Sequence, residues 1–145
     1  MRTPYVHIAC CIETSPALEG ILAEAEHLRQ LGKGRLSLVH VVEPPDAYRD
    51  VPGMRQEVEL AENVVGRRWL EAQCERLKGA EPVLLEGRPV EAVCAWAASE
   101  GVDLIIAGAH RGPDERRELG SFAGELAYSA PANLHLVRPS RGTSA

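Results

Sequence analysis

Short apolar runs alternate along the chain with longer segments whose apolar residues recur at helical spacing. The runs cover residues 5–12, 36–42, 82–86, 104–107 and 134–137. Runs this short and this uniformly apolar are typical of parallel strands that are covered on both faces. Since a helical segment joins each run to the next, the alternation predicts an α/β fold: one parallel sheet with helices on both faces.

The first helical segment carries a start signal, and the second carries an apolar stripe. The first is expected to begin with Thr14 or Ser15 as N-cap and Pro16 at the first helical position. The second covers about residues 56–77, and its apolar stripe is expected to face the core. Because Trp69 lies on that stripe, it is interpreted as a core anchor rather than a binding residue. The stripe consists of Val58, Ala61, Val65, Trp69 and Ala72.

Two shorter helices complete the pattern. The third is expected to start at the turn Gly87-Arg88-Pro89, and the fourth covers residues 121–129. Their apolar spacing predicts the inward-facing residues. These are Val90, Val93, Cys94 and Ala97 on the third helix, and Phe122, Ala123 and Leu126 on the fourth.

Length and charge bound the class of protein. The 145 residues fit one compact domain at 1–139, followed by a polar tail at 140–145. A net charge of −5 and an aromatic content of 4% disfavour binding to nucleic acid or to an anionic membrane. The N-terminal residues show no signal core, and no run is long enough to cross a bilayer. We therefore expect a cytoplasmic protein.

Four cysteines, Cys10, Cys11, Cys74 and Cys94, form no CxxC pair and match no zinc-site spacing. Cys10 and Cys11 are neighbours on a predicted strand, so their side chains point to opposite faces and cannot easily hold one metal together. All four are interpreted as buried small hydrophobic residues in a reducing compartment, and no metal is expected.

The stretch from 102 to 122 is the first candidate for chemistry. Gly108 ends an apolar run, a polar loop follows, and Gly120-Ser121 opens a helix. A strand, a glycine loop and a Gly-Ser pair at a helix start commonly hold phosphate, because bare N–H groups and the positive helix end face the anion. The alternative is that both glycines only make turns and that Ser121 is an N-cap.

Topology predicts where this stretch meets the rest of the chain. In an open doubly wound sheet, ligands bind beyond the carboxyl ends of the strands, where the strand order reverses. If the first and fourth strands are neighbours there, Glu13 and the 108–121 loop line one crevice, and Val41 forms its apolar wall. Such a crevice suits a nucleotide, with an apolar slot for the base, a carboxylate for ribose hydroxyls and N–H groups for phosphates.

Five segments form a characteristic series along the chain. They are Ile8-Ala-Cys-Cys-Ile-Glu-Thr-Ser-Pro16, Leu38-Val-His-Val-Val-Glu-Pro44, Glu86-Gly-Arg-Pro-Val-Glu-Ala-Val93, Gly101-Val-Asp-Leu-Ile-Ile-Ala-Gly108 and Leu119-Gly-Ser-Phe122. Taken together in this order, they resemble the universal stress proteins, a small flavodoxin-like family related to adenine-nucleotide-binding α/β proteins. The resemblance covers nearly the whole chain and implies the strand order 3-2-1-4-5, a homodimer and, in one branch of the family, bound ATP.

The ATP-binding branch has an Asp after the first strand and the pattern G-x-x-G-x(9)-G-[ST] after the fourth. Here Glu13 stands at the Asp position, and Arg111 stands at the second glycine, with eight residues between it and Gly120. Arg111 either supplies charge to a phosphate or fills the loop of a member that binds no triphosphate. His110 is likewise either a phosphate-side contact or an exposed loop histidine.

The resemblance implies a nucleotide site for ATP or AMP. Ile12 and Val41 would surround the base, and Glu13 would bind the ribose. The phosphate side would comprise Ala107, Gly108, His110, Arg111, Gly120, Ser121 and Phe122. The alternative is a dimeric interaction module of the same fold that binds an unknown protein partner and no nucleotide.

An enzyme is the least favoured class, because the sequence shows no activated nucleophile with a base, no metal cluster and no Walker-type lysine. The resemblance instead implies a regulatory homodimer. The last strand, around Leu134 and Leu136, is expected at a sheet edge, where unpaired N–H and C=O groups favour pairing with a second copy.

Overall fold

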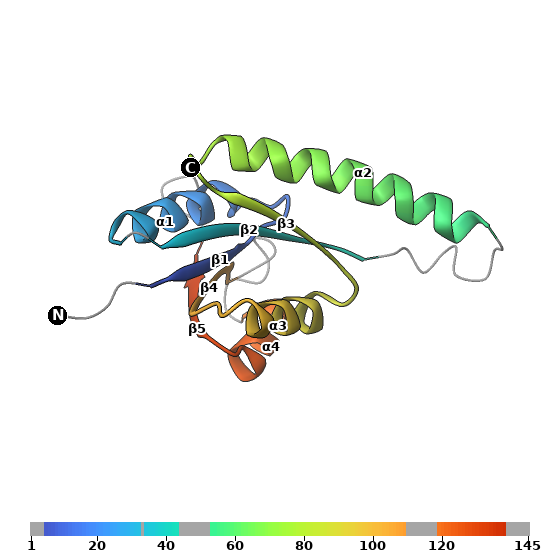
Figure 1. Cartoon of the computed structure of the whole chain (residues 1–145). Coiled ribbons are helices and arrows are strands. Elements are labelled where there is room, and N and C mark those ends of the chain that lie inside the picture. Colours follow the sequence, from blue (N-terminus) through green and yellow to red (C-terminus); the bar gives the residue numbers. More distant parts are fainter. Residues whose placement is uncertain (1–4, 33, 44–52, 110–118, 139–145) are drawn as a thin grey trace, which may run out of the picture.

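The computed structural model describes residues 5–32, 34–43, 53–109 and 119–138, and its sheet has the predicted architecture (Figure 1). Five parallel strands lie in the order β3-β2-β1-β4-β5. The predicted α/β fold and strand order are confirmed. The strands are β1 (His7–Cys11), β2 (Arg35–Val42), β3 (Glu81–Glu86), β4 (Leu104–Gly108) and β5 (Asn133–Val137).

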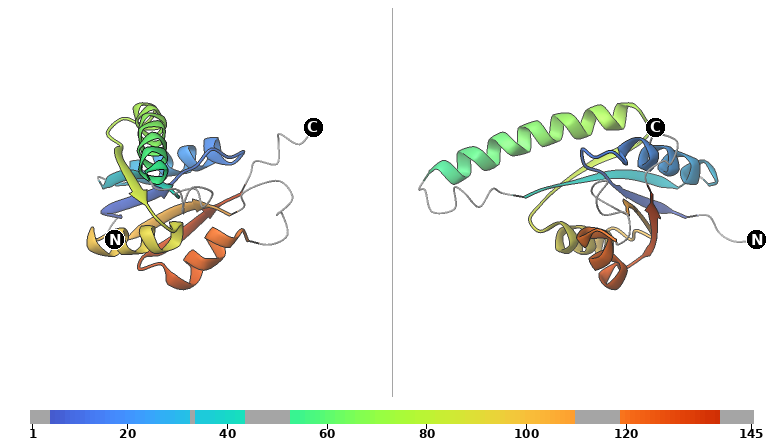
Figure 2. Two further views of the ribbon diagram at one scale, coloured as in Figure 1. Left: turned by 90° about the vertical axis from the view of Figure 1, so that its right-hand side faces the viewer. Right: turned by 180° about the vertical axis from the view of Figure 1, so that it is seen from behind.

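Helices cover both faces of the sheet (Figures 1 and 2). Helices α1 (Leu18–Gln30) and α2 (Met54–Glu75) lie on one face, and α3 (Pro89–Ser99) and α4 (Ser121–Ser129) lie on the other. Because successive side chains of a strand point to opposite faces, Cys10 packs into the core under α1 and Cys11 into the core under α3 and α4. Each strand therefore contributes to two apolar cores.

A polar cluster fixes the amino-terminal end of β1. The Asp103 carboxylate accepts hydrogen bonds from the backbone N–H groups of Val6 and His7, each at 2.9 Å. The ring of His7 is buried, and its Nε2 lies 2.8 Å from the Ser37 hydroxyl on β2. The bonds of His7 satisfy polar groups that would otherwise be buried without partners, whereas the Val6 bond lies at the surface.

Helix α2 packs with a different face from the predicted one. Gly66 and Leu70 are buried and Trp69 is half-buried, whereas Val65 is 66% exposed and Ala61 and Ala72 are also exposed. A Cβ on Gly66 would lie 3.1 Å from Cγ2 of Val42, so the glycine permits close approach of α2 to β2. The prediction was right for Trp69, which packs against the core, and wrong for most of the stripe.

Of two further local predictions, the capping of α1 was wrong and the burial of the cysteines was right for two of the four. Helix α1 has Ala17 as its N-cap, with no side-chain capping bond, and Ser15 contributes only its carbonyl oxygen to the Leu18 N–H. Of the four cysteines, Cys10 and Cys11 are buried, but Cys74 and Cys94 are only half-buried.

Strand β5 lies at the sheet edge, as predicted, with Leu134 and Leu136 packed against the α3/α4 core. Dimerisation through this edge stays a prediction. The predicted tail at 140–145 lies outside the described residues. Among the helices of the described segments, none has the length and apolar character needed to span a membrane.

Candidate functional site

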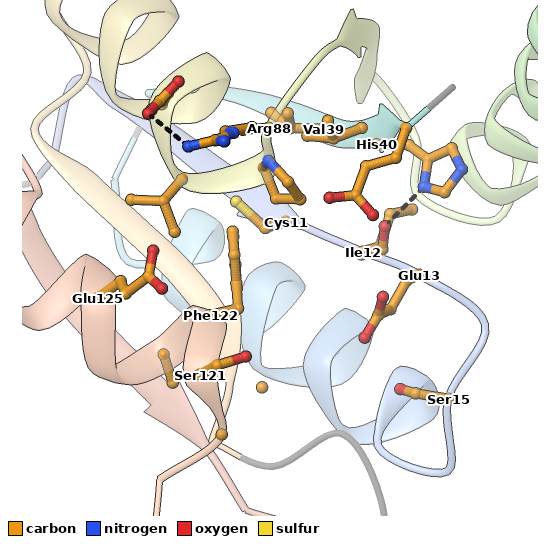
Figure 3. Close-up of a pocket in the computed structure, with 18 of the residues that line it drawn as sticks. Cys11, Ile12, Glu13, Ser15, Val39, His40, Arg88, Ser121, Phe122 and Glu125 are labelled. Atoms are coloured by element: carbon orange, nitrogen blue, oxygen red, sulfur yellow. Dashed lines mark hydrogen bonds and ion pairs between the residues drawn. The ribbon is translucent and has the colours of Figure 1, made fainter. Parts of the chain in front are cut away.

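A pocket of about 370 Å³ lies at the carboxyl ends of β1, β2 and β4, between the starts of α3 and α4 (Figure 3). The strand order reverses between β1 and β4, so the pocket occupies the position where open α/β sheets bind ligands. Its lining residues are Cys11, Ile12, Glu13, Ser15, Ile21, Val39, His40, Val41, Glu43, Arg88, Pro89, Val90, Glu91, Gly108, Gly120, Ser121, Phe122, Ala123 and Glu125.

Backbone hydrogen bonds bring the start of α4 to the end of β4. The N–H of Ala109 donates to the Val137 carbonyl at 2.9 Å, which extends the pairing of β4 with β5. The N–H of Gly120 then donates to the Ala109 carbonyl, also at 2.9 Å. Ala109 and Gly120 are thus in direct contact although the polar loop separates them in the sequence. Gly108 and Gly120 line the same pocket.

Helix α4 presents its amino-terminal end to the pocket. Its N-cap is Gly120, no side chain makes a capping bond there, and its first turn contains no acidic residue. The N–H groups of a helix's first turn lack intrahelical partners, and the helix dipole is positive at that end. This end of the pocket is therefore suited to a small anion. The alternative view of Ser121 as an N-cap is wrong, because Ser121 is already helical.

The opposite side of the pocket is formed by the ends of β1 and β2. The Ile12 N–H donates to the Val39 carbonyl at 2.8 Å, so the chain leaves β1 in register with β2. His40 Nδ1 lies 3.0 Å from the Ile12 carbonyl oxygen, and because a carbonyl only accepts, Nδ1 carries the proton. Glu13 follows directly and is half-buried, and Figure 3 shows Glu13 and Ser121 on facing sides of the pocket.

Apolar groups form the inner wall. Val39, Val41 and Phe122 line the pocket together with the buried Cys11 side chain. Burial raises the pKa of the Cys11 thiol to about 12, so the group is neutral at physiological pH and contributes apolar surface. An apolar wall with few polar groups at its rim is typical of small-molecule sites.

Acidic side chains predominate among the charged lining residues that the structure describes. The acidic lining residues are Glu13, Glu43, Glu91 and Glu125. The described lining contains one arginine, Arg88, and no lysine. Arg88 Nη1 lies 3.7 Å from Glu91 Oε1, and both side chains are largely exposed. The pocket therefore combines a helix end that favours an anion with a rim that disfavours high negative charge.

The structure brings most of the predicted site residues together. Seven of them line the pocket: Ile12, Glu13, Val41, Gly108, Gly120, Ser121 and Phe122. Ala107 does not, because it is fully buried in the core under α3 and α4. His110 and Arg111 lie outside the described residues, so their predicted roles stay predictions.

Sequence reasoning missed the wall formed by the start of α3. Arg88, Pro89 and Glu91 were interpreted only as a helix start, although the segment Glu86–Val93 was one of those that carried the family resemblance. His40 and Glu43 were also missed, although they lie in the segment Leu38–Pro44 that carried the family resemblance, and Glu125 was missed with no motif to mark it. Among the described residues, no group of three His, Cys, Asp or Glu side chains is placed to hold a metal ion.

The fold and the pocket define a doubly wound α/β protein with a crevice at its strand-order reversal. Residues 4–138 match the model of the universal stress protein family, and the chain belongs to that family. A universal stress protein from Thermus aquaticus, encoded in the QAH/OAS sulfhydrylase 3′ region, is 33% identical over 125 residues. That match covers 81% of this chain and 85% of the relative.

Solved structures share the fold at lower sequence identity. The hypothetical protein MJ0577 superposes with a TM-score of 0.83 at 21% identity, covering 96% of this chain and 99% of that one. A universal stress protein from Archaeoglobus fulgidus, solved in complex with dAMP, has a TM-score of 0.63 at 17% identity, with 92% and 98% covered. A universal stress protein solved in complex with cAMP has a TM-score of 0.62 at 18% identity, and the match covers 95% of this chain and 100% of that one.

Proposed function

We propose that this universal stress protein is a non-enzymatic regulatory protein that binds an adenine nucleotide in the pocket between β1 and β4. The observation that carries the proposal is the placement of the α4 start, at Gly120 and Ser121, across the pocket from Glu13. The size of the pocket is in the range of small-molecule sites. Two structures with this fold hold adenine nucleotides.

Each part of the nucleotide has a partner of suitable chemistry. Ile12 and Val41 contribute apolar surface for the base, and the Glu13 carboxylate accepts hydrogen bonds from ribose hydroxyls. Gly108, Gly120 and the first turn of α4, including Phe122, receive the phosphate. His110 and Arg111 are proposed to complete the phosphate side.

The charge of the rim favours one phosphate over three. Each added phosphate brings negative charge toward Glu43, Glu91 and Glu125, and Arg88 already faces Glu91. The sequence of the loop adds no net charge, since Arg111, Arg116 and Arg117 balance Asp114, Glu115 and Glu118. AMP should therefore bind more tightly than ATP. Mg²⁺ should reduce this difference in affinity, because it screens the charge of the triphosphate.

Isothermal titration with AMP and ATP, with and without Mg²⁺, tests the proposal. Gly120→Val should weaken AMP binding by roughly tenfold or more, since it adds a branched side chain at the phosphate end. Gly124→Ala is the matched control in the same helix, because a Cβ there meets nothing within 4 Å. No heat from either nucleotide would overturn the proposal and favour a dimeric interaction module that binds no nucleotide.

The non-enzymatic part of the proposal has its own test. Burial keeps the Cys11 thiol in the pocket wall neutral, and a neutral thiol is a poor nucleophile. Incubation with ATP should release phosphate only at the background rate. Phosphate release well above background that is lost in Glu13→Gln would show the protein to be an enzyme. That result would contradict the non-enzymatic part of the proposal but not the proposal that the pocket binds a nucleotide.

A further inference from the structure

Helix α2 carries an apolar face that its own fold leaves uncovered. The helix packs on β2 and β3 through its carboxyl-terminal half, where Gly66 and Leu70 are buried. Its amino-terminal half extends beyond the ends of the strands (Figures 1 and 2). On that half, Leu60, Val64 and Val65 are 65%, 52% and 66% exposed. Single exposed apolar residues are ordinary, but three within two helical turns form a patch.

The uncovered residues form one continuous stripe, which we term the outer face of α2. It has an apolar centre, an acidic end toward the amino terminus and a basic end toward the carboxyl terminus. Positions 57, 61, 64 and 68 follow the three-and-four spacing of a helix–helix contact seam. The outer face consists of Glu57, Leu60, Ala61, Val64, Val65 and Arg68, all of them exposed.

The charges of this face complement a reversed copy of the same face. Glu57 lies four residues before Ala61, and Arg68 lies four residues after Val64. If Ala61 packs against Val64 of a second copy in antiparallel orientation, Glu57 comes beside Arg68 of that copy, and the pair occurs twice by symmetry. A parallel arrangement would set Glu57 against Glu57 and Arg68 against Arg68, which is repulsive.

We propose that the outer face of α2 is a self-association surface on which a second copy of this chain packs in antiparallel orientation. The same register sets Leu60 against Val65 of the second copy, so the apolar centre is covered from both sides. Within the described part of the chain, no ion pair engages Glu57 or Arg68. The surface uses none of the residues that line the nucleotide pocket and does not involve β5.

Sedimentation velocity at high micromolar concentration tests the proposal. Glu57→Arg and Arg68→Glu should each weaken self-association by roughly tenfold or more, because each replaces two attractive pairs with two repulsive ones. An equimolar mixture of the two variants should associate again, since every charge then meets its opposite. Lys78→Glu makes the same charge change as Arg68→Glu at an exposed position beyond the end of α2 and should have no effect.

Val64→Asp tests the apolar centre of the face and should halve the particle mass. In samples dilute enough to suppress association, its thermal unfolding midpoint should match that of the wild type, since Val64 is half-exposed. If β5 also pairs copies, the mass should fall from a tetramer to a dimer rather than from a dimer to a monomer. A monomeric wild type would overturn the proposal, as would a mass unchanged by Val64→Asp. Failure of the mixed variants to associate would overturn the antiparallel arrangement.

Discussion

Truncating Leu70 on α2 should unfold the protein far more easily than truncating Leu60 on the same helix. Leu70 is 0% exposed and packs into the core under α1 and α2, whereas Leu60 is 65% exposed. Leu→Ala changes helix propensity little, so the difference between the two variants reports packing. Loss of a fully buried leucine costs about 2–5 kcal/mol, from lost burial plus the cavity left behind. The exposed position should cost about 0.5 kcal/mol or less.

Urea unfolding followed by circular dichroism measures the difference. With a denaturant dependence of about 2 kcal/mol per molar, Leu70→Ala should lower the midpoint by roughly 1.5 M. Leu60→Ala should lower it by roughly 0.2 M, provided that the protein is dilute enough to suppress association through α2. Equal shifts, or a larger shift for Leu60→Ala, would refute the packing of α2 described above.

Two further predictions concern the sheet. Asp103→Ala should lower the free energy of unfolding by about 1–3 kcal/mol in the same urea assay, because the carboxylate accepts N–H bonds from Val6 and His7, and Asp103→Asn should lose less. Arg35 lowers the pKa of the Glu81 carboxyl, so this pair stabilises the fold above the unfolded-state pKa of Glu81 and loses its contribution as the pH falls through the lower, folded-state pKa. Arg35→Ala should therefore reduce the acid sensitivity of the urea midpoint slightly, since the pair is about half exposed.

The sheet could be predicted because each strand is short, apolar and joined to the next by a helix. In such strands both faces are buried, and the topology leaves few alternatives. The local signals were weaker. Thr14 and Ser15 are good capping residues, yet α1 begins at Leu18 behind an Ala17 cap. Side-chain caps contribute little compared with the burial of Ile21 and Leu22, which determines where the helix lies on the sheet.

The error on α2 has a physical cause. Its sequence contains two apolar stripes, one through Gly66 and Leu70 and another through Ala61 and Val65. Periodicity detects a stripe but not what covers it, and half of this helix extends past the sheet. Of the stripe predicted from the sequence, Ala61 and Val65 lie on the surface that we propose binds a second copy, whereas Trp69 packs against the core.

The candidate site was predictable where it depends on topology. Glu13 and Gly108 meet because the neighbouring parallel strands β1 and β4 end at one edge of the sheet. Gly120 joins them through the hydrogen bond from its N–H to the Ala109 carbonyl, which strand order does not require. Arg88 and Glu125 were not predictable in this way. Arg88 reaches the pocket from the N-cap of α3 and Glu125 from the middle of α4, so their positions depend on how the two helices pack on the sheet.

His40 joins the two surfaces on which the proposals rest. Its Nδ1 donates to the Ile12 carbonyl beside the pocket, while its ring lies 4.8 Å from the Trp69 ring on α2. A substitution at His40 would disturb both the chain after β1 and the packing of α2. A change in nucleotide binding or in self-association could then come from either disturbance. The variants at Gly120 and on the outer face of α2 leave His40 and both of its contacts in place. Loss of nucleotide binding in the first set and loss of self-association in the second therefore report on separate surfaces.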